Sequence, residues 1–344
     1  MNDPDAQPDT PKTPGALLHA GLRLAGIFAL LLVFTGALYV LPGLTSNKVG
    51  PGYAVGVSIL FVVPFCVGAL ASLLLDPKGT RDLGFHIGAL PFTMIIALIM
   101  IGGLALREGI ICMLMLFPVW WLFAALGGFT VYRLHRGFHD RQRTRVFSSL
   151  FASLAALSTL IDPAAFIGEQ AFTTSREVII DAPAETVWPH LLSIENIGVD
   201  ESTWNLTQGL IGVPRPASAR IVGNSEGAVR YAEWGANIGF EEHITQWTAN
   251  QNLAWSFVFP DDSIATHTDR HIHPAGAHLT VASGGYRLTP LPGNRTELTL
   301  YTDYRLNTPL NHYAALWGNF MLGDIQDNIL HIVKDRSEAA AAQP

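Results

Sequence analysis

The residues with the clearest capacity for chemistry lie between positions 267 and 278. The run His267-Thr268-Asp269-Arg270-His271-Ile272-His273 is followed by a Pro-Ala-Gly-Ala turn and His278. In an extended chain, side chains two positions apart share a face, and three imidazoles with one carboxylate are possible zinc ligands. Same-face residues are roughly 6.8 Å apart, however, so four ligands on one straight strand would spread over about 20 Å. We therefore expect a polar loop here, and no metal.

Two acid–base hypotheses remain. Asp269 precedes His271 by two positions and could orient its imidazole through a hydrogen bond. Glu241 and Glu242 are adjacent on a predicted strand and point to opposite faces, so they do not form an acid–base pair. Glu242 could face a cavity and act as a base with a raised pKa, or it could be a solvated charge on an edge strand. The candidate catalytic residues are thus Asp269, His271 and Glu242.

Aromatic side chains are dense in the second half of the chain. Aromatic walls with a few polar tips suit a cavity for an apolar ligand, although they suit an ordinary core as well. The candidate ligand-binding residues are Trp204, Trp234, Trp247, Trp255, His278, Tyr286, Tyr304 and Trp317. No nucleophile elbow, P-loop, dinucleotide fingerprint or HExxH motif occurs, and we expect no cofactor.

The elements that must position these residues follow from periodicity. Alternating, β-branched segments predict a strand at 175–181 and six more at about 218–224, 227–234, 238–248, 252–259, 278–290 and 295–306. On the last of these, Tyr304 shares the predicted inward face with Leu298, Leu300, Thr302 and Leu306. A short helix follows Pro183, and a helix of about 25 residues with one wide apolar stripe closes the chain, with Asp324 and Asp327 expected in solvent. The order of these elements indicates an α+β domain.

Three segments of this domain resemble the START/Bet v 1-like (SRPBCC, polyketide cyclase/dehydrase-like) superfamily. They are 178–188 (VIIDAPAETVW), 239–247 (GFEEHITQW), and the pair 285–306 with the helix that follows. The resemblance covers roughly 175–336. It implies a helix-grip fold, in which a curved antiparallel sheet wraps a long C-terminal helix with an apolar cavity between them. The whole chain is similar to bacterial membrane proteins that fuse hydrophobic helices to such a domain.

The first half is hydrophobic. Its uncharged runs are Leu24–Asn47, Val49–Leu75, Leu83–Leu106 and Gly109–Tyr132, and about 20 residues suffice to cross a bilayer as a helix. A fifth candidate, 146–168, is interrupted by Asp162-Pro163 and could instead lie at the interface. We predict a transmembrane bundle of four or five helices over 16–168. The sequence further predicts a disordered tail at 1–15, the helix-grip domain at 172–337 and a second tail at 338–344.

Charge sets the expected orientation and excludes one class of partner. Five arginines between 133 and 145 indicate a cytoplasmic segment, which puts the N-terminus in the cytoplasm. If 146–168 crosses, the C-terminal domain lies outside the cytoplasm, with the inner membrane of a bacterium as the expected location. Residues 169–344 carry 20 acidic against 10 basic side chains, so nucleic acid is an unfavourable partner.

The sequence therefore predicts a membrane-anchored domain that binds a hydrophobic small molecule or lipid, for transport or sensing. One alternative is a cyclase, dehydratase or hydrolase acting on an apolar substrate. The other is a structural or interaction domain whose cavity is filled by its own side chains.

Overall fold

The computed structural model describes residues 22, 25–38, 56–101, 110–135, 141–161, 168–235, 238–260, 274–276 and 278–343. The chain divides into two compact units. The first comprises Met1–Val49, Gly56–Gly102 and Leu116–Pro163, and the second comprises Gly50–Val55, Gly103–Met115 and Ala164–Pro344. The tail predicted at 1–15 lies outside the described residues.

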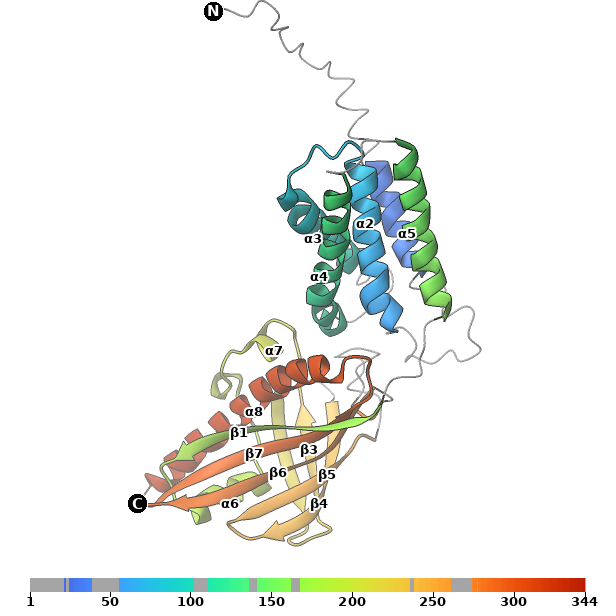
Figure 1. Ribbon diagram of the computed structural model, residues 1–344. Coiled ribbons are helices and arrows are strands. Elements are labelled where there is room, and N and C mark those ends of the chain that lie inside the picture. The colour runs from blue at the N-terminus through green and yellow to red at the C-terminus, as the bar shows by residue number, and fades with distance from the viewer. Residues whose placement is uncertain are drawn as a thin grey trace, which may run out of the picture. The chain divides into compact units, whose positions relative to one another are not determined.

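The first unit is entirely helical in its described part (Figure 1). Its helices are Ala25–Leu38, η1 (Ser58–Val62) with α2 (Val63–Leu75), η2 (Phe85–Ala89) with α3 (Leu90–Ile101), α4 (Ile110–His135) and α5 (Arg141–Ile161). By length and composition, two of the described helices can cross a membrane, at Ser58–Leu75 and Ile111–Leu134. Three further apolar helices, Ala25–Leu38, Phe85–Ile101 and Arg145–Thr159, are shorter. Parts of the runs predicted at 24–47, 83–106 and 146–168 lie outside the described residues. The bundle of four or five crossings stays a prediction.

Helices α2 and α4 approach each other closely enough to require glycine. A Cβ atom added to Gly127 would lie 2.0 Å from the carbonyl oxygen of Phe65, and one added to Gly68 would lie 2.1 Å from that of Ala124. Gly84-x-x-x-Gly88 also has the small-residue spacing that serves close packing of helices. A Cβ atom at Gly88 has no atom within 4 Å, so the close approach occurs elsewhere. Small residues at such crossings allow backbones to pack without side chains between them.

A buried acid–imidazole pair lies beside this crossing. The Asp76 carboxylate accepts hydrogen bonds from the backbone N–H groups of Thr80 and Arg81, both at 2.9 Å, and from the Thr80 hydroxyl at 3.1 Å. Its other partner is the fully buried His86, with Nε2 at 3.2 Å. Both carboxylate oxygens of Asp76 are therefore satisfied by groups within ten residues of it.

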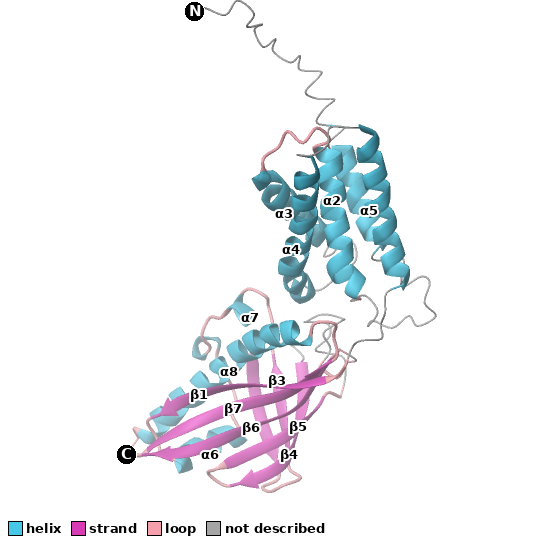
Figure 2. Cartoon of the chain, viewed as in Figure 1, coloured by secondary structure: helices cyan, strands magenta, loops and turns pink. Residues whose placement is uncertain are grey.

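The second unit is one antiparallel sheet that curves around a long helix (Figure 2). The strands lie in the order β1-β7-β6-β5-β4-β3-β2. Their bounds are β1 Gln170–Ile180, β2 Pro216–Val222, β3 Val229–Trp234, β4 Ile238–Thr248, β5 Asn252–Val258, β6 Leu279–Leu291 and β7 Arg295–Leu306. The helices are α6 Ala184–Leu192, α7 Leu206–Gly209 and α8 Asn311–Ala341, with the 3-10 turn η5 at Val199–Glu201. This is the helix-grip arrangement that the sequence predicted.

Alternation along the strands explains why the sheet closes on α8. On β7, every second residue from Leu298 to Leu306 is buried, including Tyr304, which confirms the predicted inward face. The core that joins the sheet to α6 and α8 includes Ile180, Trp188, Leu253 and Leu330. Between β6 and β7, Gly293 and Asn294 adopt positive φ angles of 83° and 61°, as a tight hairpin turn requires.

Helix α8 continues past the predicted end of the domain at 337. The Glu338 carboxylate accepts a hydrogen bond from the backbone N–H of Asp181 at 2.8 Å, and Lys334 donates to the carbonyl of Ile179 at 2.7 Å. These contacts tie the last turns to the end of β1, so residues 338–341 belong to the helix and not to a tail.

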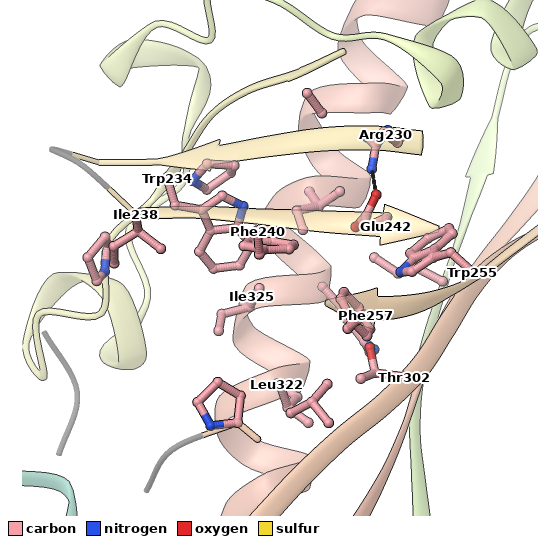
Figure 3. A pocket seen from close by; sticks show the side chains of 18 of the residues that line it. Arg230, Trp234, Ile238, Phe240, Glu242, Trp255, Phe257, Thr302, Leu322 and Ile325 are labelled. Carbon is pink, nitrogen blue, oxygen red and sulfur yellow. Dashed lines mark hydrogen bonds and ion pairs between the residues drawn. The ribbon is translucent and has the colours of Figure 1, made fainter. Parts of the chain in front are cut away.

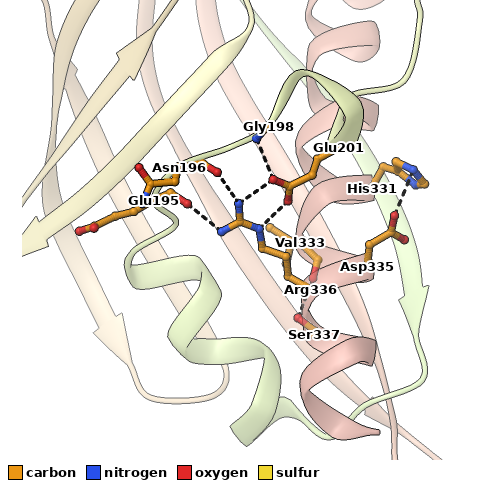
Figure 4. A network of polar contacts seen from close by, with 9 residues as sticks. All are labelled: Glu195, Asn196, Gly198, Glu201, His331, Val333, Asp335, Arg336 and Ser337. Carbon is orange, nitrogen blue, oxygen red and sulfur yellow. Dashed lines mark hydrogen bonds and ion pairs between the residues drawn. The ribbon is translucent and has the colours of Figure 1, made fainter. Parts of the chain in front are cut away.

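Two further polar contacts hold loops onto α8. Arg336 forms a bidentate pair with Glu201, at 2.7 and 2.9 Å, and donates to the carbonyls of Glu195 and Asn196 (Figure 4). About three helical turns earlier, Asp324 accepts hydrogen bonds from the backbone N–H and the hydroxyl of Thr207, at 3.0 and 2.8 Å. The expectation that Asp324 is solvated was therefore wrong, because it anchors the N-terminus of α7.

The neighbouring acid on α8 behaves as expected. Asp327 is exposed and makes a solvent-accessible ion pair with Arg176 at 3.5 Å. Asn328, one position further, is buried and donates to Gln208 on α7 at 2.8 Å. The segment around α7 is thus attached to α8 mainly through hydrogen bonds.

Candidate functional site

A cavity of about 240 Å3 lies between the sheet and α8 (Figure 3). Its wall is apolar almost throughout. The sheet contributes Trp234, Phe240, Trp255, Phe257 and Tyr286, and α8 contributes Leu322, Ile325, Ile329, Ile332 and Val333. An apolar cavity of roughly 150 Å3 is enough to take up benzene, so this one has room for a ligand of about two rings. The described side chains therefore do not fill the space between the two layers.

One ion pair is buried in this apolar wall. Arg230 on β3 and Glu242 on β4 are directly opposite in the strand register, which places both side chains on the inward face. Nη1 of Arg230 donates to Oε2 of Glu242, and each residue is only 5% exposed. Figure 3 shows the pair at the edge of the cavity, with Trp255 nearby. A charge pair removed from water in this way is retained only when the two groups compensate each other.

Burial dominates the electrostatics of the pair. It raises the pKa of the Glu242 carboxyl above its ordinary value, while the adjacent Arg230 guanidinium opposes that shift. Burial also raises the pKa of the Tyr286 hydroxyl, while the nearby Arg230 guanidinium opposes that shift. The guanidinium carbon of Arg230 lies 6.0 Å from the centroid of the Tyr286 ring. The Tyr286 ring in turn lies 5.3 Å from that of Trp255, between ring centroids. Arg230, Glu242, Tyr286 and Trp255 thus form one cluster, the polar end of the cavity.

A second polar group enters the cavity from α8. Nε2 of Gln326 donates to the carbonyl of Thr174 at 3.1 Å and to the hydroxyl of Thr302 at 3.0 Å. Both Gln326 and Thr302 line the cavity. The site therefore has polar groups on the sheet and on the helix, separated by apolar surface.

Four of the sequence-predicted residues meet at this cavity: Trp234, Trp255, Tyr286 and Glu242. The alternative in which Glu242 is a solvated charge on an edge strand is wrong, since β4 lies between β3 and β5. Glu241 points to the other face, as expected, where its carboxylate contacts Nε2 of His243 at 2.7 Å.

The other predicted ligand-binding residues do not line the cavity in the described part of the chain. Trp204 is 69% exposed, because it lies over Gly209 on the outside of α7. Trp247 packs edge-on against Trp188, since a bulge after Ile244 shifts the register of β4.

The last three predicted ligand-binding residues lie near the start of α8 or the end of β7. Tyr304 stacks on Phe172 and faces a separate, shallow hollow. Trp317 lies against Phe320, and Nδ1 of His278 is 2.9 Å from the carbonyl oxygen of Asn307.

The histidine-rich segment holds the remaining candidate catalytic residues. Residues 261–273 lie outside the described residues, and with them the candidates Asp269 and His271. Among the described residues, no group of three or more His, Cys, Asp or Glu side chains could hold a metal ion.

Arg230 and Gln326 are two polar cavity residues that the sequence analysis missed. Arg230 alternates with Ala228 and Ala232, whose small side chains are a weak marker of an inward face. Glu242 had a stronger signal, because it lies an even number of positions from Ile238, Phe240 and Ile244 and therefore shares their face of the strand. Gln326 lies between Ile325 and Asp327, and only its depth in the helix–sheet interface identifies it.

No protein-family model matches the chain, and no curated protein matches it. Among solved structures it is similar to the di-domain ARO/CYC BexL from the BE-7585A biosynthetic pathway, with 16% identity and a TM-score of 0.34. This similarity covers 64% of each of the two chains. The Zhui aromatase/cyclase from Streptomyces sp. R1128 has 15% identity and a TM-score of 0.32, over 50% of this chain and 98% of that one.

A third similar structure is Ara h 8.0201, with 13% identity and a TM-score of 0.30, over 49% of this chain and 99% of that one. Similarity at this level concerns the fold and does not assign an activity, which has to follow from the cavity itself.

Proposed function

We propose that this protein is a membrane-anchored binding protein that holds a hydrophobic small molecule between its sheet and α8. The observation that carries the proposal is the cavity of about 240 Å3, whose wall is apolar except for a few buried polar groups. Burial of an apolar ligand there would contribute about 25 cal/mol per Å2 of surface removed from water. The polar groups would fix the orientation of the ligand.

Membrane anchoring is supported by the two helices long and apolar enough to cross a bilayer. An anchor would keep the cavity beside the phase into which apolar ligands partition, and so raise their effective concentration. The proposed orientation has the N-terminus in the cytoplasm and the cavity outside it, in a bacterial inner membrane.

Orientation is tested with a Ser225→Cys variant, because Ser225 is an exposed residue of the sheet unit. In cells with a permeabilised outer membrane, a membrane-impermeant maleimide should label this cysteine. Labelling only after lysis would place the unit in the cytoplasm.

Binding is tested by native mass spectrometry of the full-length chain, purified in detergent from its own host. The expected result is a co-purifying apolar compound of defined mass. In an Ile325→Trp variant the larger side chain occupies part of the cavity, and the compound should be lost. Leu316→Trp is the matched control on the same helix, because Leu316 is 69% exposed and does not line the cavity. An apo mass for the native chain, or equal loss in both variants, would contradict the proposal.

An enzyme acting on an apolar substrate is the second candidate, as a cyclase, dehydratase or hydrolase. The observation in its favour is the carboxyl group of Glu242 in the cavity wall, with a pKa raised by burial. A general acid or base needs such a group within hydrogen-bond reach of the substrate. Prolonged incubation of the purified protein with the co-purified compound separates the two functions. A dehydratase or hydrolase changes the mass of the compound, and a cyclase that only closes a ring changes its chromatographic retention at the same mass. A binding protein returns the compound unchanged in both respects.

A further inference from the structure

Three polar atoms on residues that line the cavity are buried without a hydrogen-bond partner among the described residues. They are Nε of Arg230, Nε1 of Trp255 and Oε1 of Gln326. The residues that carry them are 5%, 2% and 2% exposed. An unpaired buried donor or acceptor is costly, so nearly all such groups in folded proteins have a partner. Two of the atoms are donors at the polar end of the cavity, and the third is an acceptor on α8.

The acceptor on α8 has a fixed identity. The Thr174 carbonyl can only accept a hydrogen bond, so the amide group of Gln326 must turn its NH2 toward Thr174. This leaves Oε1 as the free end of the amide. An amide oxygen accepts hydrogen bonds and does not donate them, so a ligand group that meets Oε1 must be a donor, such as a hydroxyl.

The donors on the sheet have a different constraint. Nε of Arg230 and Nε1 of Trp255 can only donate, so a ligand group that meets them must be an acceptor. The charge of Arg230 is already compensated by Glu242, with which it pairs directly. A ligand carboxylate would add an uncompensated negative charge to this buried group, whereas a carbonyl oxygen would not. The polar end therefore favours a neutral acceptor over an anion.

We propose that the ligand is a neutral, largely apolar molecule with a carbonyl oxygen that meets Arg230 and Trp255 and a hydroxyl that donates to Gln326. This inference rests on the proposed binding function and specifies its ligand class. The donors on β3 and β5 would bind one end of the molecule, and the acceptor on α8 would bind the other. The apolar wall would bury the part of the molecule between them. From its volume, the cavity accepts a body of about two rings.

The test uses the full-length chain in detergent and four compounds of similar size, with titrations into empty micelles subtracted. The probes are 6-hydroxy-1-tetralone, which has both polar groups, 1-tetralone, tetralin and the anion 6-hydroxy-2-naphthoate. We expect affinity to fall about fivefold to tenfold with each polar group removed. The naphthoate should bind more weakly than the hydroxytetralone.

A variant tests whether the carbonyl oxygen of the ligand contacts Trp255. Trp255→Phe removes the indole N–H from the cavity, and Trp188→Phe removes a buried indole from the core outside it. Trp255→Phe should reduce the preference for 1-tetralone over tetralin, whereas Trp188→Phe should retain it even if stability falls. The preference is a ratio within one variant, so a general loss of stability does not imitate the expected result.

The outcomes separate this inference from the binding function. Equal affinities for tetralin and hydroxytetralone would keep apolar binding and overturn the ligand class. Tighter binding of the naphthoate would also overturn it, because the site would then be an anion site. Failure of all four probes to bind to the native chain would contradict the binding function itself.

Discussion

The two units of this chain use buried space in opposite ways. In the helical unit, α2 and α4 are so close that a single Cβ atom at Gly127 would lie 2.0 Å from a backbone oxygen. The buried Asp76 there has its oxygens satisfied by nearby groups. In the sheet unit, about 240 Å3 stays open, and three polar atoms of the residues around it have no hydrogen-bond partner among the described residues. Spare volume together with spare hydrogen-bonding capacity distinguishes a binding site from a packed core.

The largest expected effect comes from breaking the cavity ion pair. Glu242→Gln keeps the shape of the side chain but leaves the Arg230 charge buried and uncompensated, and we expect a loss of about 3–5 kcal/mol in stability. Hydrogen exchange of the β3 and β4 amides in the full-length chain measures it.

The control is a double variant, Arg230→Met with Glu242→Leu. It replaces both charges by apolar groups and should recover most of the lost stability. If the double variant is as unstable as Glu242→Gln, the pair supports the fold through something other than charge compensation.

The second prediction tests the absence of space in the helical unit. Gly127→Ala forces a methyl group against the Phe65 carbonyl, and we expect a loss of about 1–3 kcal/mol from the separation of α2 and α4. Gly88→Ala is the matched control, since no atom lies within 4 Å of the new methyl group and alanine favours helix. Thermal unfolding of the two variants in the same detergent compares them. Equal melting temperatures would show that the helices can separate without cost.

The smallest effect concerns a polar pair of the sheet unit that is fully partnered and outside the cavity. The hydrogen bonds from Arg336 lower the pKa of the Glu201 carboxyl from its ordinary value of 4.5. The pair therefore stabilises the fold in full above about pH 4.5, and this stabilisation is lost as the pH falls through the lowered pKa.

Because the pair is partly exposed, we expect Glu201→Gln to cost only about 0.5–1 kcal/mol at pH 7. Urea unfolding at pH 7 and again at pH 3 checks the sign. The difference between native and variant chains should shrink at the lower pH, and ligand binding should be unchanged at pH 7. A difference that grows on acidification would contradict the assignment.

Much of the second unit could be predicted from the sequence. The strand at 238–248 has the predicted bounds, because burial alternates from Ile238 to Ile244 and a turn follows Thr248. The site was harder to predict, for reasons visible in single residues. Glu242 is adjacent to another acid, which favoured the interpretation as a solvated charge. Its two-residue spacing from Phe240 and Ile244 nevertheless places it on the inward face. Trp204 shows the reverse, since a large aromatic side chain suggested burial while the short helix beside it left it exposed.

Sequence periodicity does not show which strands pair or in which register. Arg230 and Glu242 are twelve positions apart and become neighbours only through the register of β3 with β4. The free oxygen of Gln326 likewise depends on the position of a carbonyl on β1, 152 residues away. Such contacts depend on tertiary packing, and no local pattern encodes them.

The attachment of α7 to α8 has a consequence for how fast a ligand exchanges. Val213 and Pro214, which line the cavity, belong to a segment held to α8 by hydrogen bonds from Thr207 to Asp324 and from Asn328 to Gln208. Water can replace such bonds as the segment moves outward, so this part of the wall should open more often than the sheet. Residence time would then depend on these four polar side chains, while affinity depends on the groups inside. Exchange rate and affinity could therefore change independently, one by substitutions along α7 and the other by substitutions in the cavity.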